Sequence, residues 1–398
     1  AAVRQDPIPP QQAPPGPGSN VTFPDDPVTQ TLNANATGLA PSHQITPDLL
    51  KHVDEIEDNY DRSRALLEIA REAILSNQLQ LAHDAVEQAG VTALKEHNPL
   101  RHDQLIIEDI VTTSSLTEAM IRERQGGQNT RKTGDGDPAA RKGSPGSPVK
   151  SIATAREEWL RSGELARHII NPTYQNEYLA RVAEGLSRDS SHIIGEYIEN
   201  PDLDALMNES DRLSDDDLKK VKEQADVFLV DALNIANTIS RPIWRNEALM
   251  RTAIAAGQSR QFPRAVHIAS TIDNAESRAQ ALILVAESQG AYRDTESATE
   301  TYSRAAQAVA CIEQGGLRGV VNGYLVDSLI SAGRFEDARA CLGLYPTESE
   351  RFVALGAIAE SQGRRGGAEK AREWIARDVP EIYRSNLYRR VNNGVLSA

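Results

Sequence analysis

Residues 351–359 read RFVALGAIA, residues 278–286 read RAQALILVA, and residues 245–253 read RNEALMRTA. Each stretch begins with Arg and places Ala three residues later, Leu four residues later and a further Ala eight residues later. Weaker copies of this phrase begin at Arg62, Gln175, Arg318 and Arg384. From residue 245 onward, successive copies begin 33, 40, 33 and 33 residues apart, and a period of this size predicts a stacked helical repeat array.

Each copy predicts the first helix of a two-helix unit, because apolar residues at steps of three and four lie on one helix face. Gly follows three of the copies, and we expect Gly257, Gly333 and Gly363 to end their first helices. Ala residues such as Ala368 and Ala371 then recur at helical spacing, and small side chains let two helices approach closely. The unit is therefore predicted to be a hairpin of antiparallel helices.

The hairpin resembles the tetratricopeptide repeat, whose first-helix Leu-Gly and second-helix Ala are matched by Leu355-Gly356, Ala368 and Ala371. The family's first-helix aromatic is missing, and Pro closes a unit only at Pro346 and Pro380. Ankyrin repeats have a similar period, but their Thr-Pro-Leu-His phrase does not occur in this chain.

The resemblance covers residues 228–398 well and residues 45–124 and 151–200 loosely. Together with the periodicity it predicts an all-α protein, a right-handed α-solenoid of stacked antiparallel helical hairpins. We expect the following organisation: an extended Pro-rich arm over 1–44, a helical block over 45–124, a flexible linker over 125–150, a helical block over 151–240 with a long helix over 214–239, and the repeat solenoid over 241–398.

The composition suits a solenoid better than several thick globular cores. Of 398 residues, 39 % are hydrophobic and 5 % aromatic, which is lean for a chain of this length. The net charge of −14 argues against a general nucleic-acid-binding protein. No apolar run approaches the roughly 18 to 20 residues that cross a bilayer, so no transmembrane segment is expected.

The first residue is Ala1, and an Ala-Ala start is compatible with a leader that has been cleaved. This favours a periplasmic or extracellular location, with a cytoplasmic one as the alternative. The Asn-X-Thr triplets at Asn20 and Asn35 are possible glycan acceptors in the arm.

Motifs for catalysis, cofactors or metals are weak throughout, so we expect no catalytic, cofactor-binding or metal site and no enzyme. The Gly-rich stretch over 126–133 lacks the second Gly of a phosphate loop and the strand before it. His97 and His102 are five residues apart, and Asp135-Gly136-Asp137 lacks the further ligands of a calcium loop.

Cys311 and Cys341 occupy matching places in successive second helices. Equivalent positions on stacked helices lie about 8–10 Å apart, whereas a disulfide needs Cα atoms within about 7 Å. We expect two small buried thiols, and a bridge between them is the alternative.

The recurring Arg, at positions 62, 245, 278, 318, 351 and 384, has two interpretations. Each Arg either bonds carbonyl groups at the end of the preceding helix, which is a structural role, or belongs to a ladder that grips an acidic partner. The same residue at the start of every unit favours the structural role.

The resemblance implies a groove lined by first-helix residues. The residues expected to face it are Trp244, Glu247, Arg251, Gln280, Glu287, Tyr324, Asp327 and Glu360. A mixture of aromatic and acidic residues suits an extended or helical segment of another protein. An ordinary solvated face is the alternative.

These features predict a non-catalytic interaction or assembly subunit that binds a partner protein, or a second copy, through the groove and the arm. One alternative is a structural subunit of a secreted fibre or surface-layer polymer, built by head-to-tail stacking. Another is a recruiting or regulatory subunit of an enzyme complex.

Overall fold

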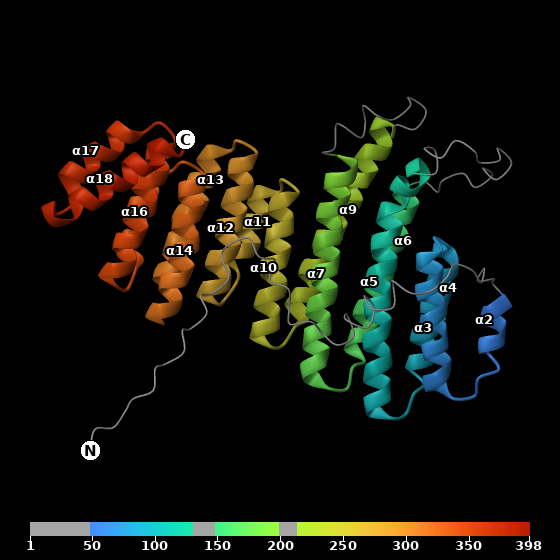
Figure 1. Ribbon diagram of the computed structural model, residues 1–398. Coiled ribbons are helices and arrows are strands. Elements are labelled where there is room, and N and C mark those ends of the chain that lie inside the picture. Colours follow the sequence, from blue (N-terminus) through green and yellow to red (C-terminus); the bar gives the residue numbers. More distant parts are fainter. Residues whose placement is uncertain (1–47, 130–147, 199–212) are drawn as a thin grey trace, which may run out of the picture. The chain divides into compact units, whose positions relative to one another are not determined.

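The computed structural model describes residues 48–129, 148–198 and 213–398, which form an all-α repeat solenoid (Figure 1). Consecutive helices pair into hairpins, and each hairpin packs against its neighbours in the chain. Within the described residues, the short helix α2 (Asp48–Val53) precedes seven hairpins and the single helix α18 (Glu381–Leu396). The hairpins are α3 (Asn59–Leu75) with α4 (Leu79–Ala93), α5 (Pro99–Asn129) with α6 (Pro148–Arg167), α7 (Pro172–Tyr197) with α9 (Asp215–Thr238), α10 (Pro242–Gln258) with α11 (Phe262–Ser270), α12 (Ala275–Ala291) with α13 (Thr295–Ala310), α14 (Gly315–Ser331) with α15 (Phe335–Ala340) and the 3-10 turn η3 (Cys341–Leu344), and α16 (Glu348–Arg364) with α17 (Ala368–Asp378).

The first helix of a hairpin begins three residues before the Arg or Gln that opens the repeated phrase, so its cap lies four residues before that residue. Asn274 caps α12 by accepting a backbone N–H bond, and Thr347 forms a capping box with Glu350 at the start of α16. Asp58 and Asn171 cap α3 and α7 in the same way. The cap therefore fixes the residue at which each first helix begins, and so determines the helix face on which each residue of the repeated phrase lies.

The first helices also end in one register. Helices α3, α10, α12, α14 and α16 are each 17 residues long, and the second residue after each has a positive φ. These residues are Asn77, Arg260, Arg293, Gly333 and Gly366. A left-handed residue at this place turns the chain back into the second helix.

The expected helix-ending role of Gly is correct for Gly333 and wrong for Gly257 and Gly363. Both lie inside their helices, α10 and α16, and both are buried. A Cβ on Gly363 would collide with the backbone carbonyl of Val391 in α18. Gly363 is needed because α16 and α18 approach each other closely. In a sequence, a Gly that permits such close packing cannot be distinguished from a Gly that ends a helix.

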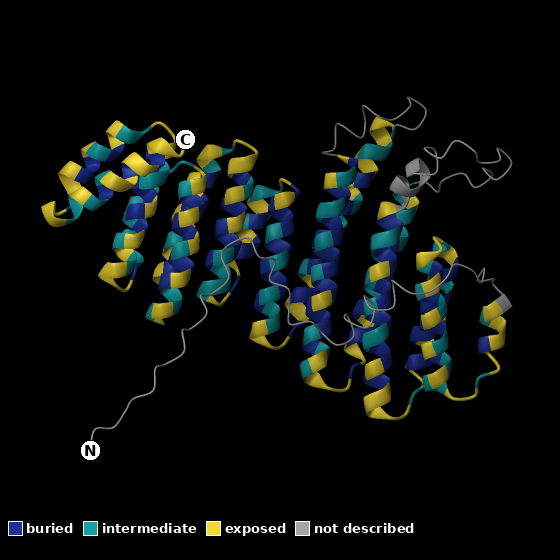
Figure 2. Cartoon of the chain, viewed as in Figure 1, coloured by how far each residue is buried: buried dark blue, intermediate teal, exposed yellow. Residues whose placement is uncertain are grey.

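The core is a layer that continues from hairpin to hairpin (Figure 2). Its largest cluster runs from Ala70 in α3 to Val391 in α18 and consists mainly of Ala, Ile, Val and Leu. Because neighbouring hairpins share this layer, each needs few large side chains, which accounts for the low aromatic content.

This layer runs through the helical blocks expected over 45–124 and 151–240 and through the solenoid expected over 241–398. Helix α5 continues to Asn129 and α6 begins at Pro148, so both enter the range 125–150 expected as linker. Gly126 and Gly127 lie inside α5, and a Gly inside a helix costs only about 1 kcal/mol. Residues 130–147, the arm over 1–44 and its Asn20 and Asn35 lie outside the described residues.

Helix α9 is the long helix expected over 214–239, and Ser214 caps it by accepting the N–H of Asp217. Three Asp residues in its first turn favour this start through the helix dipole. Among the helices that the structure describes, neither α9 nor any other is long and apolar enough to cross a membrane.

Candidate interaction surface

The recurring Arg holds the loop that precedes its own helix. Arg278 donates to the carbonyl oxygen of Ile272, 2.7 Å away, and Gln175 donates to that of Ile169 at 3.2 Å. The same loop bond is formed by Arg62, Arg318, Arg351 and Arg384. Arg245 differs, because it pairs with the Asp273 carboxylate at 2.7 Å. The structural role is therefore confirmed for five of the six Arg residues.

Cys311 and Cys341 are both free thiols and cap the ends of α13 and α15, so their matching places are confirmed. The expectation that both are buried is wrong for Cys311, which is exposed where α13 ends at the surface. Burial raises the pKa of Cys341 to about 11, so this thiol stays protonated near neutral pH.

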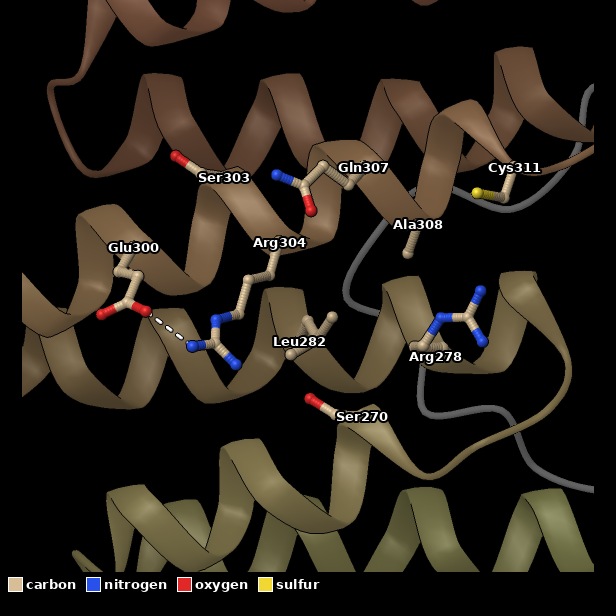
Figure 3. A pocket seen from close by; sticks show the side chains of 9 residues that line it. All are labelled: Ser270, Arg278, Leu282, Glu300, Ser303, Arg304, Gln307, Ala308 and Cys311. Atoms are coloured by element: carbon tan, nitrogen blue, oxygen red, sulfur yellow. Dashed lines mark hydrogen bonds and ion pairs between the residues drawn. The ribbon is translucent and has the colours of Figure 1, made fainter.

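A shallow depression of about 570 Å³ lies over α12, between α11 and α13 (Figure 3). Glu300 and Arg304 form an ion pair at 2.6 Å inside it, and the Arg278 guanidinium is engaged by its own loop. Leu282 and Ala308 line its apolar part, and none of the eight residues predicted for the groove lines it. The lining contains no His and no nucleophile paired with a base. In the ranges that the structure describes, no group of His, Cys, Asp and Glu has the arrangement of a metal site.

The eight predicted groove residues all lie on first helices, at the third, sixth, tenth or thirteenth position after the cap. These steps of three and four place them on one face of each helix. We call this surface the first-helix face. Tyr324 and Asp327 are exposed on it, whereas Trp244 is half-buried and packs against the core. The structure therefore brings the predicted residues onto one face but leaves Trp244 little free surface.

Charges at both ends of this predicted set are satisfied within the protein. Arg251 on α10 lies 2.9 Å from Glu247 on its own helix and 3.7 Å from Glu184 on α7. Glu360 on α16 pairs with Arg390 on α18 at 3.0 Å. The Arg251–Glu184 and Glu360–Arg390 pairs join neighbouring helices, and all three pairs are partly exposed, so each contributes little to stability.

Between these pairs the face carries four exposed apolar residues. Leu284 on α12 is 39 % exposed, Val320 and Tyr324 on α14 are 55 % and 40 % exposed, and Val353 on α16 is 70 % exposed. We call these four residues the apolar patch. Leu284, Val320 and Val353 are absent from the sequence prediction, although they stand at the same sixth and tenth positions as predicted residues. That shared register is the signal by which they can be found.

Two carboxylates border the apolar patch, Glu287 on α12 and Asp327 on α14, both at the thirteenth position. Neither forms an ion pair with any of the residues described. Burial raises the pKa of Asp327 because no cation compensates for the lost hydration, and its charge helps to raise the pKa of the neighbouring Tyr345. We call Glu287 and Asp327 the acidic edge.

Comparison with known proteins leaves this chain without an assigned family: no family model and no curated protein matches it. Among solved structures, it is similar to a circular tandem repeat protein with a novel repeat topology and enhanced subunit contact surfaces. The two are 15 % identical over 88 % of this chain and 86 % of that chain, with a TM-score of 0.39. It is also similar to Ton1535 from Thermococcus onnurineus NA1, at 15 % identity over 86 % of this chain and 94 % of that chain, with a TM-score of 0.28. We therefore assign this chain as a helical repeat protein from its own helices and not from these two similarities.

A different chemistry holds the hairpins before α10 together. His83 on α4 lies 2.6 Å from Glu158 on α6, whose other oxygen accepts from Arg161 at 3.1 Å. Arg161 also donates to Asp109 on α5 at 2.9 Å, and Gly90 leaves room for its guanidinium. Buried charges that are paired and hydrogen-bonded in this way position helices relative to one another. This network connects α4, α5 and α6 and is not part of the first-helix face. We call it the joint between α4 and α6.

Proposed function

We propose that this chain is a non-catalytic interaction or assembly subunit that binds a partner protein on its first-helix face. The observation that carries the proposal is the apolar patch, which spans three successive first helices, α12, α14 and α16. Exposed apolar side chains that gather on neighbouring helices are typical of protein interaction sites. Partner binding would remove these side chains from water.

The architecture supports this role. A stack in which each hairpin contacts its neighbours presents a long surface built from equivalent positions on successive helices. A tetratricopeptide-type groove is the specific form that we propose for this surface, because the repeated phrase and the 17-residue first helices present one face in constant register. A recruiting or regulatory subunit of an enzyme complex would use the same face.

Head-to-tail stacking into a polymer is less well supported. In α12 the ninth and twelfth positions after the cap are Ile283 and Ala286, and both are buried. The equivalent residues of α18 are Arg389 and Asn392, and both are exposed. A polar surface at positions that internal helices bury does not favour a further hairpin packed there.

Affinity capture with matched variants tests the proposal. Val320→Glu places a charge in the apolar patch, and Val91→Glu places the same charge on α4 at a Val of nearly equal exposure, 54 % against 55 %. We expect partner proteins to be captured by the wild type and by Val91→Glu and lost from Val320→Glu. Circular dichroism of both variants checks that the fold is intact. Capture of the same proteins by Val320→Glu would show that the first-helix face is not the binding surface.

A further inference from the structure

The apolar patch has the dimensions of a short binding site for a single segment. Helices α12, α14 and α16 are neighbours in the stack, and packed helices lie about 8–10 Å apart. The path from Leu284 to Val353 across Tyr324 is therefore roughly 20 Å long, which about 14 residues of α-helix cover. The patch is wide enough for one helix laid across three others.

The acidic edge runs beside this path. Glu287 and Asp327 occupy equivalent positions on adjacent helices, so the two carboxylates lie on the same side of the apolar patch. Glu360, the equivalent residue on α16, already pairs with Arg390. Two unpaired negative charges thus border an apolar surface on one side.

Asp327 is the residue that points to a ligand. It lies exposed on the first-helix face beside Tyr345, where the surrounding protein partly desolvates its carboxylate and raises its pKa, and no ion pair or hydrogen bond of the described residues engages it. A carboxylate without a partner beside an exposed apolar surface is a position at which an incoming Lys or Arg can form a charge-assisted hydrogen bond. An uncharged apolar partner would instead bury Asp327 further, and burying an unpaired charge costs free energy.

The chemistry of the surface also disfavours other forms of partner. Nucleic acid would bring phosphates against Glu287 and Asp327. An extended peptide would lay unpaired backbone N–H and C=O groups on aliphatic side chains, whereas a helix satisfies its own backbone. A helix with apolar residues at steps of three and four matches the apolar patch, and basic residues along one side match the acidic edge.

We propose that the apolar patch and the acidic edge together bind a basic amphipathic helix of a partner protein. Its apolar stripe covers Leu284, Tyr324 and Val353, and a Lys or Arg pairs with Asp327. This inference rests on the proposed function, because it specifies the partner chemistry of the same face.

Two fluorescein-labelled peptides of about 14 residues, roughly 20 Å as helices, test this directly with the full-length protein. They share one Leu-rich face, and the opposite face carries Lys in one peptide and Glu in the other. By fluorescence anisotropy at physiological salt, we expect saturable binding of the Lys peptide that is at least about tenfold tighter than that of the Glu peptide.

Variants locate the binding. Asp327→Asn keeps the shape of the side chain, removes its charge and should weaken the Lys peptide about fivefold to tenfold without lowering the denaturation midpoint. The double charge reversal Glu287→Lys with Asp327→Lys should weaken it further and improve binding of the Glu peptide. Glu87→Lys, an exposed acid on α4, is the control and should change affinity less than about twofold.

Equal binding of the two peptides, or unchanged binding to Asp327→Asn, would overturn the inference. A photo-crosslinking amino acid at position 320 separates this failure from failure of the proposed function. If a captured protein crosslinks there through a segment that is not basic, the proposed function stands and the inference fails. If the Lys peptide crosslinks and no captured protein does, the inference stands for the surface and the proposed function fails.

Discussion

The role of a single residue in this chain is set by its position in the repeated phrase. Arg278 reaches the carbonyl of Ile272, six residues earlier, so the loop between two hairpins is held by the helix that follows it. Gln175 makes the equivalent bond with an amide, which shows that the position needs a long donor more than a positive charge. A loop carbonyl left without this donor would lose a hydrogen bond in a partly buried site.

Arg278→Met should therefore lower the free energy of unfolding by about 1–2 kcal/mol, because the Ile272 carbonyl loses its donor. Arg278→Gln should lose less, since Gln175 performs this role in α7. Arg245→Gln is the control and should change stability by less than about 0.5 kcal/mol, because Arg245 makes only an exposed ion pair. Urea denaturation followed by circular dichroism measures all three. A loss for Arg245→Gln as large as that for Arg278→Met would contradict this account of the loop bond.

The role of this Arg could be predicted from the sequence because it recurs at one place in every unit. The exposure of Val320 and Val353 could not, because an apolar residue in an amphipathic helix is ordinarily taken as buried. Only the stacking of hairpins decides which stripe of a first helix stays uncovered. Cys311 shows the same limit: its place in the repeat was predictable, and its exposure at the end of α13 was not.

At the scale of elements, the period predicts the helices that obey it. The 17-residue first helices follow from the repeated phrase, its cap and its left-handed turn residue. Helices α5 and α7 contain 31 and 26 residues, and no repeated phrase in the sequence predicts their extra length. The sequence also does not predict the buried ion pairs and hydrogen bonds of this region, because Asp109, Glu158 and Asp189 follow no repeated pattern. These acids come into contact with their partners only when the hairpins pack.

The joint between α4 and α6 should depend on pH. The hydrogen bond to Glu158 raises the pKa of His83 above its ordinary value of 6.5, against the effect of burial. Its stabilising contribution is complete below pH 6.5 and is lost as the pH rises through the raised value. Burial alone would raise the pKa of Glu158, but His83 and Arg161 together outweigh burial and lower this pKa below 4.5, so the contribution of Glu158 is complete above pH 4.5 and is lost in acid. The joint should therefore be strongest between pH 4.5 and 6.5.

We expect the melting temperature to fall as the pH rises from 6.5 through the raised pKa of His83, and to fall less in His83→Gln, which should be less stable than the wild type at the acidic end. Asp109 faces the same network, and burial raises its pKa, so its ionisation costs stability in the same direction as the pH rises. The difference between wild type and His83→Gln isolates the histidine from Asp109 and from the nearby Asp84 and Glu87. Identical pH profiles for the two proteins would contradict the prediction.

At the scale of the whole molecule, two kinds of packing hold one continuous core. The hairpins before α10 are joined by buried polar groups, such as Trp159, whose indole N–H donates to the fully buried Asp189 at 2.7 Å. Between α16 and α18 the contact depends on Gly363 and Gly394, which let two backbones touch. Each contact joins neighbours in the stack, so stability should be local even though the core is continuous.

Hydrogen exchange followed by mass spectrometry can separate these two regions. In Gly394→Ala the added Cβ meets the Glu360 carbonyl, forces α18 away from α16 and should lower protection in both helices at least about tenfold, with little change in α3 to α7. Asp189→Ala removes the acceptor of Trp159 and should lower protection in α5, α6 and α7 while α16 and α18 keep theirs. Gly290→Ala is the control, because a Cβ there meets open space, and it should be neutral or stabilise by about 0.5–1 kcal/mol. A loss of protection spread evenly over all described helices in either variant would show that the stack unfolds as one cooperative unit, and the nearest-neighbour account would then be wrong.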